Sequence, residues 1–135
     1  MERAIGVVTD VKDLGELLSG AMVDQARLSP SAGRLRLELE LTRAMPERTT
    51  VVRRGLFSRA TTPWIKSRLV LEQIQQVGIQ RLTETSVEQS PLLVCDAVPG
   101  GYTLTVTSPD GLRLSVSLEQ LSGRFSDVGQ PIESP

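Results

Sequence analysis

The chain has 135 residues, with 39% hydrophobic and 23% charged positions, a formal net charge of −1, one cysteine and no histidine. This composition is typical of one globular domain and excludes a disordered chain or one held together by disulfide bonds. The near-neutral charge gives no long-range attraction to phosphate backbones or anionic membranes, so nucleic acid is not an expected partner. Without histidine, imidazole-based catalytic triads and metal centres are excluded, and no cofactor is expected.

The N-terminal residues lack the long apolar core of a signal peptide, and no apolar run in the sequence is long enough to cross a membrane. The basic residues are thirteen arginines and two lysines. Arginine suits bidentate anion recognition, but codon usage in a GC-rich genome explains the same bias and is the favoured interpretation. We therefore expect a cytoplasmic bacterial protein that has no membrane partner.

Residues 9–22 are predicted to form the helix of the chain, with Asp10 as its N-cap. Gly15 weakens this helix, and Gly20 is expected to end it. Apolar residues recur at helical spacing and form one stripe that can be buried: Val11, Leu14, Leu17, Leu18 and Ala21.

Strands are predicted to follow the helix. The first covers residues 23–28, and a turn at 29–33 leads to the clearest signal in the chain, at 34–41. There, leucine alternates with charged residues over eight positions, which indicates a strand with one buried and one solvated face. A further strand is predicted over 49–58, with Gly55 as a bulge. The alternating leucines are Leu35, Leu37, Leu39 and Leu41.

The second half of the chain starts with an ambiguous segment. Residues 65–82 fit a helix, or a strand that bends near Gln75 and Gln76 with a bulge at Gly78; the strand is preferred because its neighbours are strands. A polar loop is predicted over 83–91. The remaining strands are a short apolar one at 92–97 and a hairpin of 102–107 with 112–118, joined by a turn at 108–111.

These elements predict an α+β fold in which antiparallel strands dominate. One N-terminal helix and about seven strands would form a small barrel or a strongly bent sheet, with the helix over one opening. Residues 1–128 are expected to form a single globular domain, followed by a loose tail at 129–135.

Two features of the strands were considered for chemistry. Cys95 lies in an apolar strand beside Asp96, which disfavours the thiolate, so a buried structural cysteine is expected. Glu38 and Glu40 share a strand face with Arg36 and its neighbours. That face is either a carboxylate pair able to act on a ligand or a solvated surface with cross-strand ion pairs, and the second interpretation is favoured.

The most basic stretch provides candidate contacts for an anion or a partner. Arg53 and Arg54, with Trp64 nearby, could hold a phosphate or a base by charge and stacking. Strand alternation places Arg53 and Arg54 on opposite faces, so only one of them joins any given patch. Arg36, from the Arg/Glu strand face, completes this set. No catalytic, cofactor-binding or metal-ligating residue is assigned.

The order of motifs is also distinctive. The stretch at 13–24 precedes the alternating strand at 34–41, and the Arg-Arg-Gly-Leu-Phe sequence at 53–57 follows. A strand at 67–77 and an ending at 118–131 that contains Asp-Val-Gly complete the pattern. This arrangement resembles a family of short, uncharacterised bacterial proteins that form a domain of unknown function. The resemblance implies no activity and no catalytic residues.

Two functions from different classes follow. The favoured one is a non-catalytic interaction module that binds another protein or a second copy of itself. The alternative is a β-barrel that binds a small molecule or an anion, or a carboxylate-based enzyme, with a concave pocket on the Arg/Glu strand face. The missing residue types disfavour catalysis.

Overall fold

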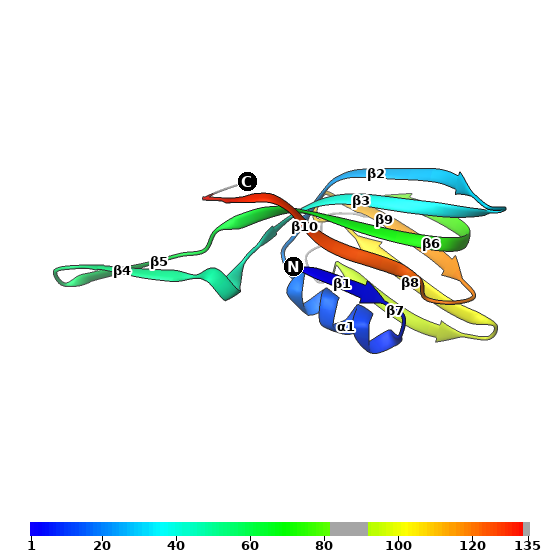
Figure 1. Ribbon diagram of the computed structural model, residues 1–135, viewed down its shortest axis with the longest axis horizontal. Coiled ribbons are helices and arrows are strands. Elements are labelled where there is room, and N and C mark those ends of the chain that lie inside the picture. Colours follow the sequence, from blue (N-terminus) through cyan, green and yellow to red (C-terminus); the bar gives the residue numbers. More distant parts are fainter. Residues whose placement is uncertain (82–91, 134–135) are drawn as a thin grey trace.

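The computed structural model describes residues 1–81 and 92–133, so the loop predicted over 83–91 lies outside the described residues. Within those ranges the chain forms one α-helix, one short 3-10 helix and ten strands (Figure 1). In chain order they are β1 (Glu2–Ile5), α1 (Val8–Leu17), β2 (Met22–Ser31), β3 (Arg34–Ala44), η1 (Pro46–Arg48), β4 (Thr50–Arg54), β5 (Phe57–Thr61), β6 (Trp64–Arg81), β7 (Leu93–Val98), β8 (Gly101–Thr107), β9 (Leu112–Leu118) and β10 (Gly123–Ile132).

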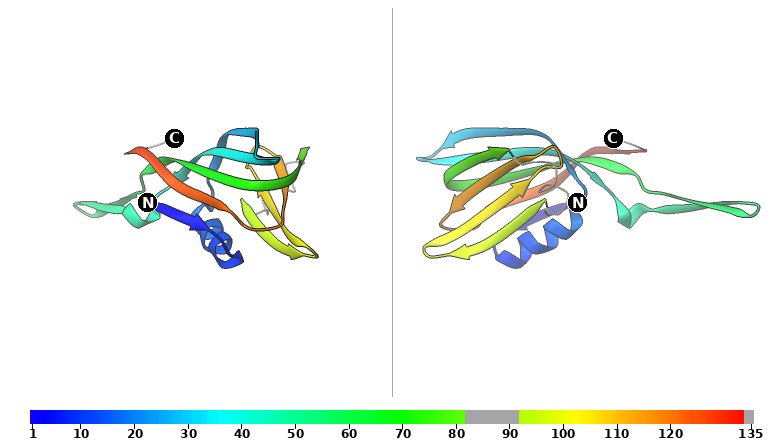
Figure 2. Two further views of the ribbon diagram at one scale, coloured as in Figure 1. Left: turned by 45° about the vertical axis from the view of Figure 1, so that its right-hand side comes forward. Right: turned by 180° about the vertical axis from the view of Figure 1, so that it is seen from behind.

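The long strand β6 organises the main sheet. Its first half pairs with β3 on one side and with β10 on the other, and its second half pairs with β9. The sheet therefore continues from β6 through β10 to β1, through β9 and β8 to β7, and through β3 to β2, with all pairings antiparallel. It curls strongly into a half-barrel (Figure 2), as the α+β prediction of a bent sheet required.

The bend in β6 allows this branching. Gln73 has a φ of 57°, and the register towards β3 shifts beside it. The register towards β9 shifts again between Ile74 and Gln76. The strand interpretation of this segment is thus confirmed, with its bend close to the predicted place. Gly78 is not the bulge, because it pairs regularly with Ser115.

The helix α1 packs against β7 and, less extensively, against β1, so it covers the open side of the half-barrel (Figure 2). It is shorter than the predicted 9–22, since Gly20, at a φ of 79°, follows its last turn. Asp10 is not the N-cap. Its carboxylate instead accepts hydrogen bonds from the backbone N–H groups of Gly6 and Val7, at 2.9 and 3.0 Å, and these bonds lower the pKa of Asp10.

The core is aliphatic apart from Phe125, as the low aromatic content predicts. It fills the concave side of the sheet under α1, where the inward positions of the strands alternate with solvated ones. Three of the four alternating leucines of β3 are buried, while Leu35 is half-buried at the sheet end. The largest core side chains are Leu14, Leu18, Leu39, Leu41, Leu69, Leu71, Ile74, Leu104, Leu118 and Phe125.

Several strands extend beyond their predicted limits. The first strand, β1, was not predicted at all. The last strand, β10, continues to Ile132, which pairs with Trp64. The expected domain boundary at residue 128 therefore falls inside β10. β2 includes Pro30, and its turn to β3 is reduced to Ala32 and Gly33, at φ values of 48° and 79°. Positive φ at both turn residues is the type I′ geometry that favours tight hairpins.

The single strand predicted over 49–58 is wrong. This segment contains a hairpin in which β4 and β5 form a separate two-stranded sheet. Arg54 pairs with Phe57, so Gly55 and Leu56 are the two-residue loop. Gly55 has a φ of 60°, and glycine at the first loop position is the signature of a type II′ turn. The residue interpreted as a bulge therefore reverses the chain.

Gly15 allows α1 to lie close against the edge of β7. A Cβ atom at this position would be 2.9 Å from the carbonyl oxygen of Leu93, closer than such atoms normally approach backbone. The glycine weakens the isolated helix, as the sequence indicates, but its lack of a side chain is what brings the helix onto the sheet.

We predict that Gly15→Ala destabilises the protein by about 1–3 kcal/mol, because the steric clash outweighs the better helix propensity of alanine. Urea unfolding at pH 7 measures the change. Gly78→Ala is the matched control, since its Cβ would meet only the Ser115 side chain at an ordinary 3.9 Å. A stabilised Gly15→Ala variant would show that α1 is not held this close to β7.

Candidate functional site

The most distinctive surface feature is the arm, which we define as residues 48–61. It contains β4 and β5 and projects from one end of the half-barrel (Figure 1). The two strands pack against each other and make no extensive contact with another described element. Leu56 at the turn is 100% exposed, and Val51 is 61% exposed. The arm thus presents apolar side chains to solvent without support from the main sheet.

The arm is also the basic part of the molecule. Its sequence contains four arginines and no acidic residue, a formal charge of +4 in a chain whose total is −1, so the rest of the chain is acidic, at −5. Arg48 and Arg53 have exposed side chains. The near-neutral total therefore conceals a strong separation of charge along the chain.

A buried ion pair anchors the base of the arm. The side chain of Arg43 is 0% exposed, and its Nε and Nη2 atoms donate to the two carboxylate oxygens of Asp127 at 3.0 and 2.8 Å. Nη2 also donates to Glu47 at 2.9 Å, and Nη1 donates to the carbonyl oxygen of Ala44 at 3.1 Å. Ser67 donates to Asp127 at 2.7 Å. The network links β3, β6, β10 and η1 where the chain leaves the sheet.

The ionisation of this network follows from its contacts. Burial raises the pKa of Asp127, but hydrogen bonds from Arg43 and Ser67 and the guanidinium charge outweigh burial, so the pKa lies below its usual value. For Arg43, burial acts in the opposite direction and lowers the pKa. The hydrogen bonds from Arg43 to Asp127 and Glu47, and the negative charges of these two residues, outweigh burial, so the pKa of Arg43 is raised. Both groups are charged at neutral pH.

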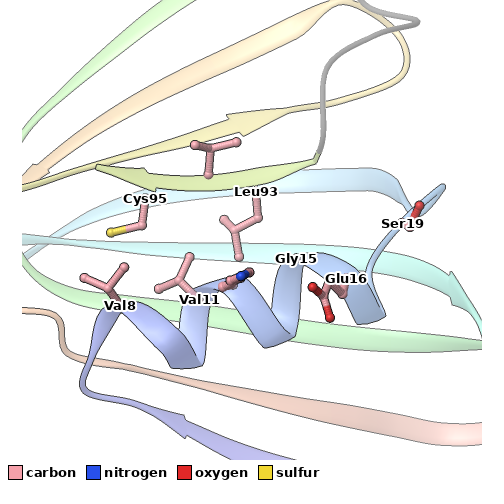
Figure 3. A pocket seen from close by; sticks show the side chains of 9 residues that line it. Val8, Val11, Gly15, Glu16, Ser19, Leu93 and Cys95 are labelled. Atoms are coloured by element: carbon pink, nitrogen blue, oxygen red, sulfur yellow. The ribbon is translucent and has the colours of Figure 1, made fainter. Parts of the chain in front are cut away.

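A groove between α1 and β7 is a largely apolar concave surface. Its volume is about 460 Å³, and it is open to solvent. Figure 3 shows Val8 and Val11 from the helix facing Leu93 and Cys95 from the strand, with Glu16 towards one end. The volume falls within the roughly 300–1,000 Å³ of typical binding pockets. The groove can accept an apolar side chain.

Cys95 is half-buried in this groove. Burial raises the pKa of its thiol, and the negative charge of Asp96 raises it further. The predicted disfavouring of the thiolate is therefore confirmed, while the predicted full burial is not found.

The outer face of the sheet carries the charged residues of β3. Arg68 Nε lies 2.8 Å from Glu38, and Arg34 Nη2 lies 3.5 Å from Glu119. The solvated strand face with cross-strand ion pairs is thus the arrangement found. Glu40 lines a shallow depression of about 270 Å³ on this face.

Arg36 lies in a second depression on the same face, about 350 Å³ in volume, with Arg124 and Ser122. Its Nε atom is buried and has no hydrogen-bond partner, since the Glu72 carboxylate is 3.6 Å away. An unsatisfied buried donor is uncommon in proteins and identifies a place where an anion could bind.

The candidate contacts predicted from the sequence do not all come together. Arg53 lies near the tip of the arm, and the backbone of Arg54 pairs beside the turn. Trp64 is half-buried where β6 begins, paired with Ala44 of β3. Arg36 is eight residues before Ala44 on β3, roughly 25 Å away along the strand. The first three therefore belong to the arm and its base, and Arg36 belongs to a separate surface.

Sequence reasoning missed the Arg43 network. A signal was present, because the alternation of buried leucines through Leu41 places position 43 on the same inward face. Extending the strand by two residues would have predicted a buried arginine in need of a carboxylate partner. Nothing local in the sequence identifies Asp127 as that partner, 84 residues away.

Among the described residues, no group of three or more cysteine, aspartate or glutamate side chains is arranged to hold a metal ion. A search of the same residues for a helix long and apolar enough to span a membrane finds none. Comparisons with protein-family models, curated proteins and solved structures give no match for this chain. The resemblance to a family of short bacterial proteins stays a prediction.

We predict that Asp127→Asn destabilises the protein by about 3–5 kcal/mol at pH 7, because it removes the more buried of the two carboxylates that pair with Arg43 and leaves only the more exposed Glu47. The folded-state pKa of Asp127 is lowered, so the pair stabilises the protein above the unfolded-state pKa of about 3.9 and loses its effect as the pH falls further. The difference between wild type and variant should therefore shrink between pH 7 and pH 3.

Urea unfolding at both pH values measures this difference. Asp96→Asn is the control, since Asp96 is exposed and outside the network, and its effect should stay within about 0.5 kcal/mol. A pH-independent loss in Asp127→Asn would show that the carboxylate charge does not stabilise the fold.

Proposed function

We propose that this protein is a non-catalytic protein-interaction module whose contact element is the arm. The observation that carries the proposal is a hairpin that makes no extensive contact with another described element and exposes Leu56 completely. A two-stranded hairpin is at best marginally stable alone in water, so burial of its apolar tip and its strand edges against a partner would stabilise it. We also propose that the protein acts in the cytoplasm of a bacterium, as the sequence analysis predicts.

The backbone of the arm supports protein binding as well. Each of β4 and β5 pairs with one strand only, so each has a free edge of N–H and C=O groups. Free edges can add a strand from a partner, which provides affinity through main-chain hydrogen bonds. The Arg43–Glu47 contact, at 2.9 Å, fixes the chain just before the arm, which reduces the conformational entropy that binding would cost.

We predict that Leu56→Asp abolishes partner capture without loss of stability. The tagged protein and the variant are incubated with lysate of the native host, and bound proteins are quantified by mass spectrometry. Because Leu56 is fully exposed, the free energy of unfolding should change by less than about 0.5 kcal/mol. Proteins bound by wild type should be depleted about tenfold or more with the variant.

Leu28→Asp is the matched control, because Leu28 is 48% exposed on β2 and pairs with Leu37, seven residues before the end of β3 from which the arm departs. It should retain the captured proteins. If Leu56→Asp and wild type bind the same proteins equally, the arm is not the contact element and the proposal is wrong.

A second candidate function is anion binding on the Arg/Glu strand face. The specific observation is the buried Nε of Arg36, which makes no hydrogen bond and has only the Glu72 carboxylate nearby, at 3.6 Å. The neighbouring Arg124 has no ion pair within the part of the chain that the structure describes. A carboxylate or phosphate between these guanidinium groups would satisfy the buried donor and would displace Glu72, which lies 3.6 Å from it.

We predict that inorganic phosphate causes saturable shifts in the backbone amide resonances of residues 122–124, measured by nuclear magnetic resonance. Arg36→Gln should weaken this binding about tenfold, equivalent to about 1.4 kcal/mol. Arg34→Gln is the control, because Arg34 lies two residues away on β3 and pairs with Glu119 instead. Shifts that are equal in both variants, or that do not saturate, exclude the site.

A further inference from the structure

The chain carries two complementary features that it cannot bring together within one molecule. The arm extends from one end of the half-barrel, whereas α1 and β7 lie on the side of the body (Figures 1 and 2). The groove lies between these two elements, and the arm points away from both of them in every view. A tip that fills the groove must therefore come from another molecule.

The two features match in polarity. Leu56 is the most exposed large hydrophobic residue of the described chain, and Val51 on the same arm is 61% exposed. The groove presents mainly apolar surface: Val8 is 38% exposed, Val94 and Cys95 are half-buried, and Val11 and Leu93 form its buried floor. Its volume of about 460 Å³ leaves room for a hairpin tip. Burying exposed apolar surface on both sides is the principal driving force for association.

The two features also match in charge. The arm contains four arginines and no acid. The rest of the chain has a formal charge of −5. The groove lining itself contains one base and one acid, Lys12 and Glu16, and the exposed Asp96 follows Cys95 on the strand wall. Opposite charges around an apolar centre steer the approach of two surfaces and fix their register.

We propose that the partner of the arm is a second copy of this chain, and that two copies exchange arms so that each tip fills the α1–β7 groove of the other. The inference rests on the proposed interaction function and names its partner. A stable interface buries about 800 Å² on each side, more than one hairpin tip supplies. A two-fold arrangement doubles the contact, because the same tip and groove are used twice.

The only cysteine of the chain provides a direct test, because Cys95 lines the groove. In Leu56→Cys, arm exchange places the new thiol beside Cys95 of the other copy, within the roughly 4.4–6.8 Å Cα separation that a disulfide needs. Oxidised glutathione at about pH 8.5 promotes the exchange, since the pKa of Cys95 is raised. Mass spectrometry should identify a dimer linked through positions 56 and 95.

Two controls make the linkage specific. Leu28→Cys carries an equally available thiol on β2 and should not link to Cys95. Leu56→Cys combined with Cys95→Ser should lose the 56–95 dimer. If position 28 links to Cys95 as readily as position 56, or if only 56–56 linkages form, the groove is not the docking site and the inference is overturned.

Sedimentation velocity of the reduced protein tests the same contact without a covalent bond. Wild type should dimerise at about 100 µM or below, and both Leu56→Asp and Val8→Lys should weaken the dimer about tenfold or more. Val8 is 38% exposed in the groove, so the substitution should leave the fold intact, as a melting curve would verify. The lysine adds a charge of the same sign as the arm.

Mixing these two variants gives the sharpest outcome. Leu56→Asp retains an intact groove and Val8→Lys retains an intact arm, so the mixture should form heterodimers through one arm–groove contact, more than either variant alone. A wild-type protein that is monomeric throughout overturns the inference. If Leu56→Asp still loses captured lysate proteins in that case, the interaction function stands and only the identity of the partner is wrong.

Discussion

The buried Arg43–Asp127 ion pair is the constraint on which the arrangement of the arm depends. Removing an arginine and an aspartate from water is costly, and a hydrophobic pair of similar volume often gives an equally stable fold. The particular contribution of this ion pair is that it fixes the direction in which the chain leaves β3. Asp127, in the middle of β10, holds the guanidinium at the end of β3. Nη1 then donates to the carbonyl oxygen of Ala44 at 3.1 Å, and Nη2 also donates to Glu47 at 2.9 Å. The chain therefore leaves the sheet at a defined point and in a defined direction.

The rest of the half-barrel separates the arm from the groove. Because β6 bends at Gln73, its two halves pair with different strands, and the sheet branches into the β10–β1 side and the β9–β8–β7 side. The helix α1 closes the space between these branches, and Gly15 sets how near it lies to Leu93. The groove remains where the helix meets the edge of β7 without covering it completely. The same bend that gives the sheet its curl thus leaves the groove into which we propose that the tip of another arm binds.

The sequence predicted those elements whose signal is local. Alternation over 34–41 gave a strand with its inward leucines, and Ser108–Gly111 marked the last hairpin, because period and turn chemistry are read within a few residues. The arm was missed because a glycine among apolar residues suits a bulge or a turn equally well, and only the pairing of β4 with β5 decides between them. β1 was missed because four residues carry too little periodicity to be recognised.

The candidate site shows the same division between local and non-local information. The sequence shows that the arm is basic. It does not show that the arm stands apart from the main sheet, and this separation is what leaves Leu56 exposed for binding.

A net charge of −1 suggested that charge plays little part in partner choice. Electrostatic attraction decays over about 8 Å at physiological ionic strength, whereas the arm extends roughly 20 Å beyond its base, so its tip is influenced by its own arginines more than by the acidic body. Phosphate backbones would attract those arginines as well, but they offer no apolar surface to Leu56. Charge and an exposed apolar tip together favour an acidic partner that offers an apolar groove. The body of this chain has a formal charge of −5 and carries the α1–β7 groove, whose charged lining residues are Lys12 and Glu16.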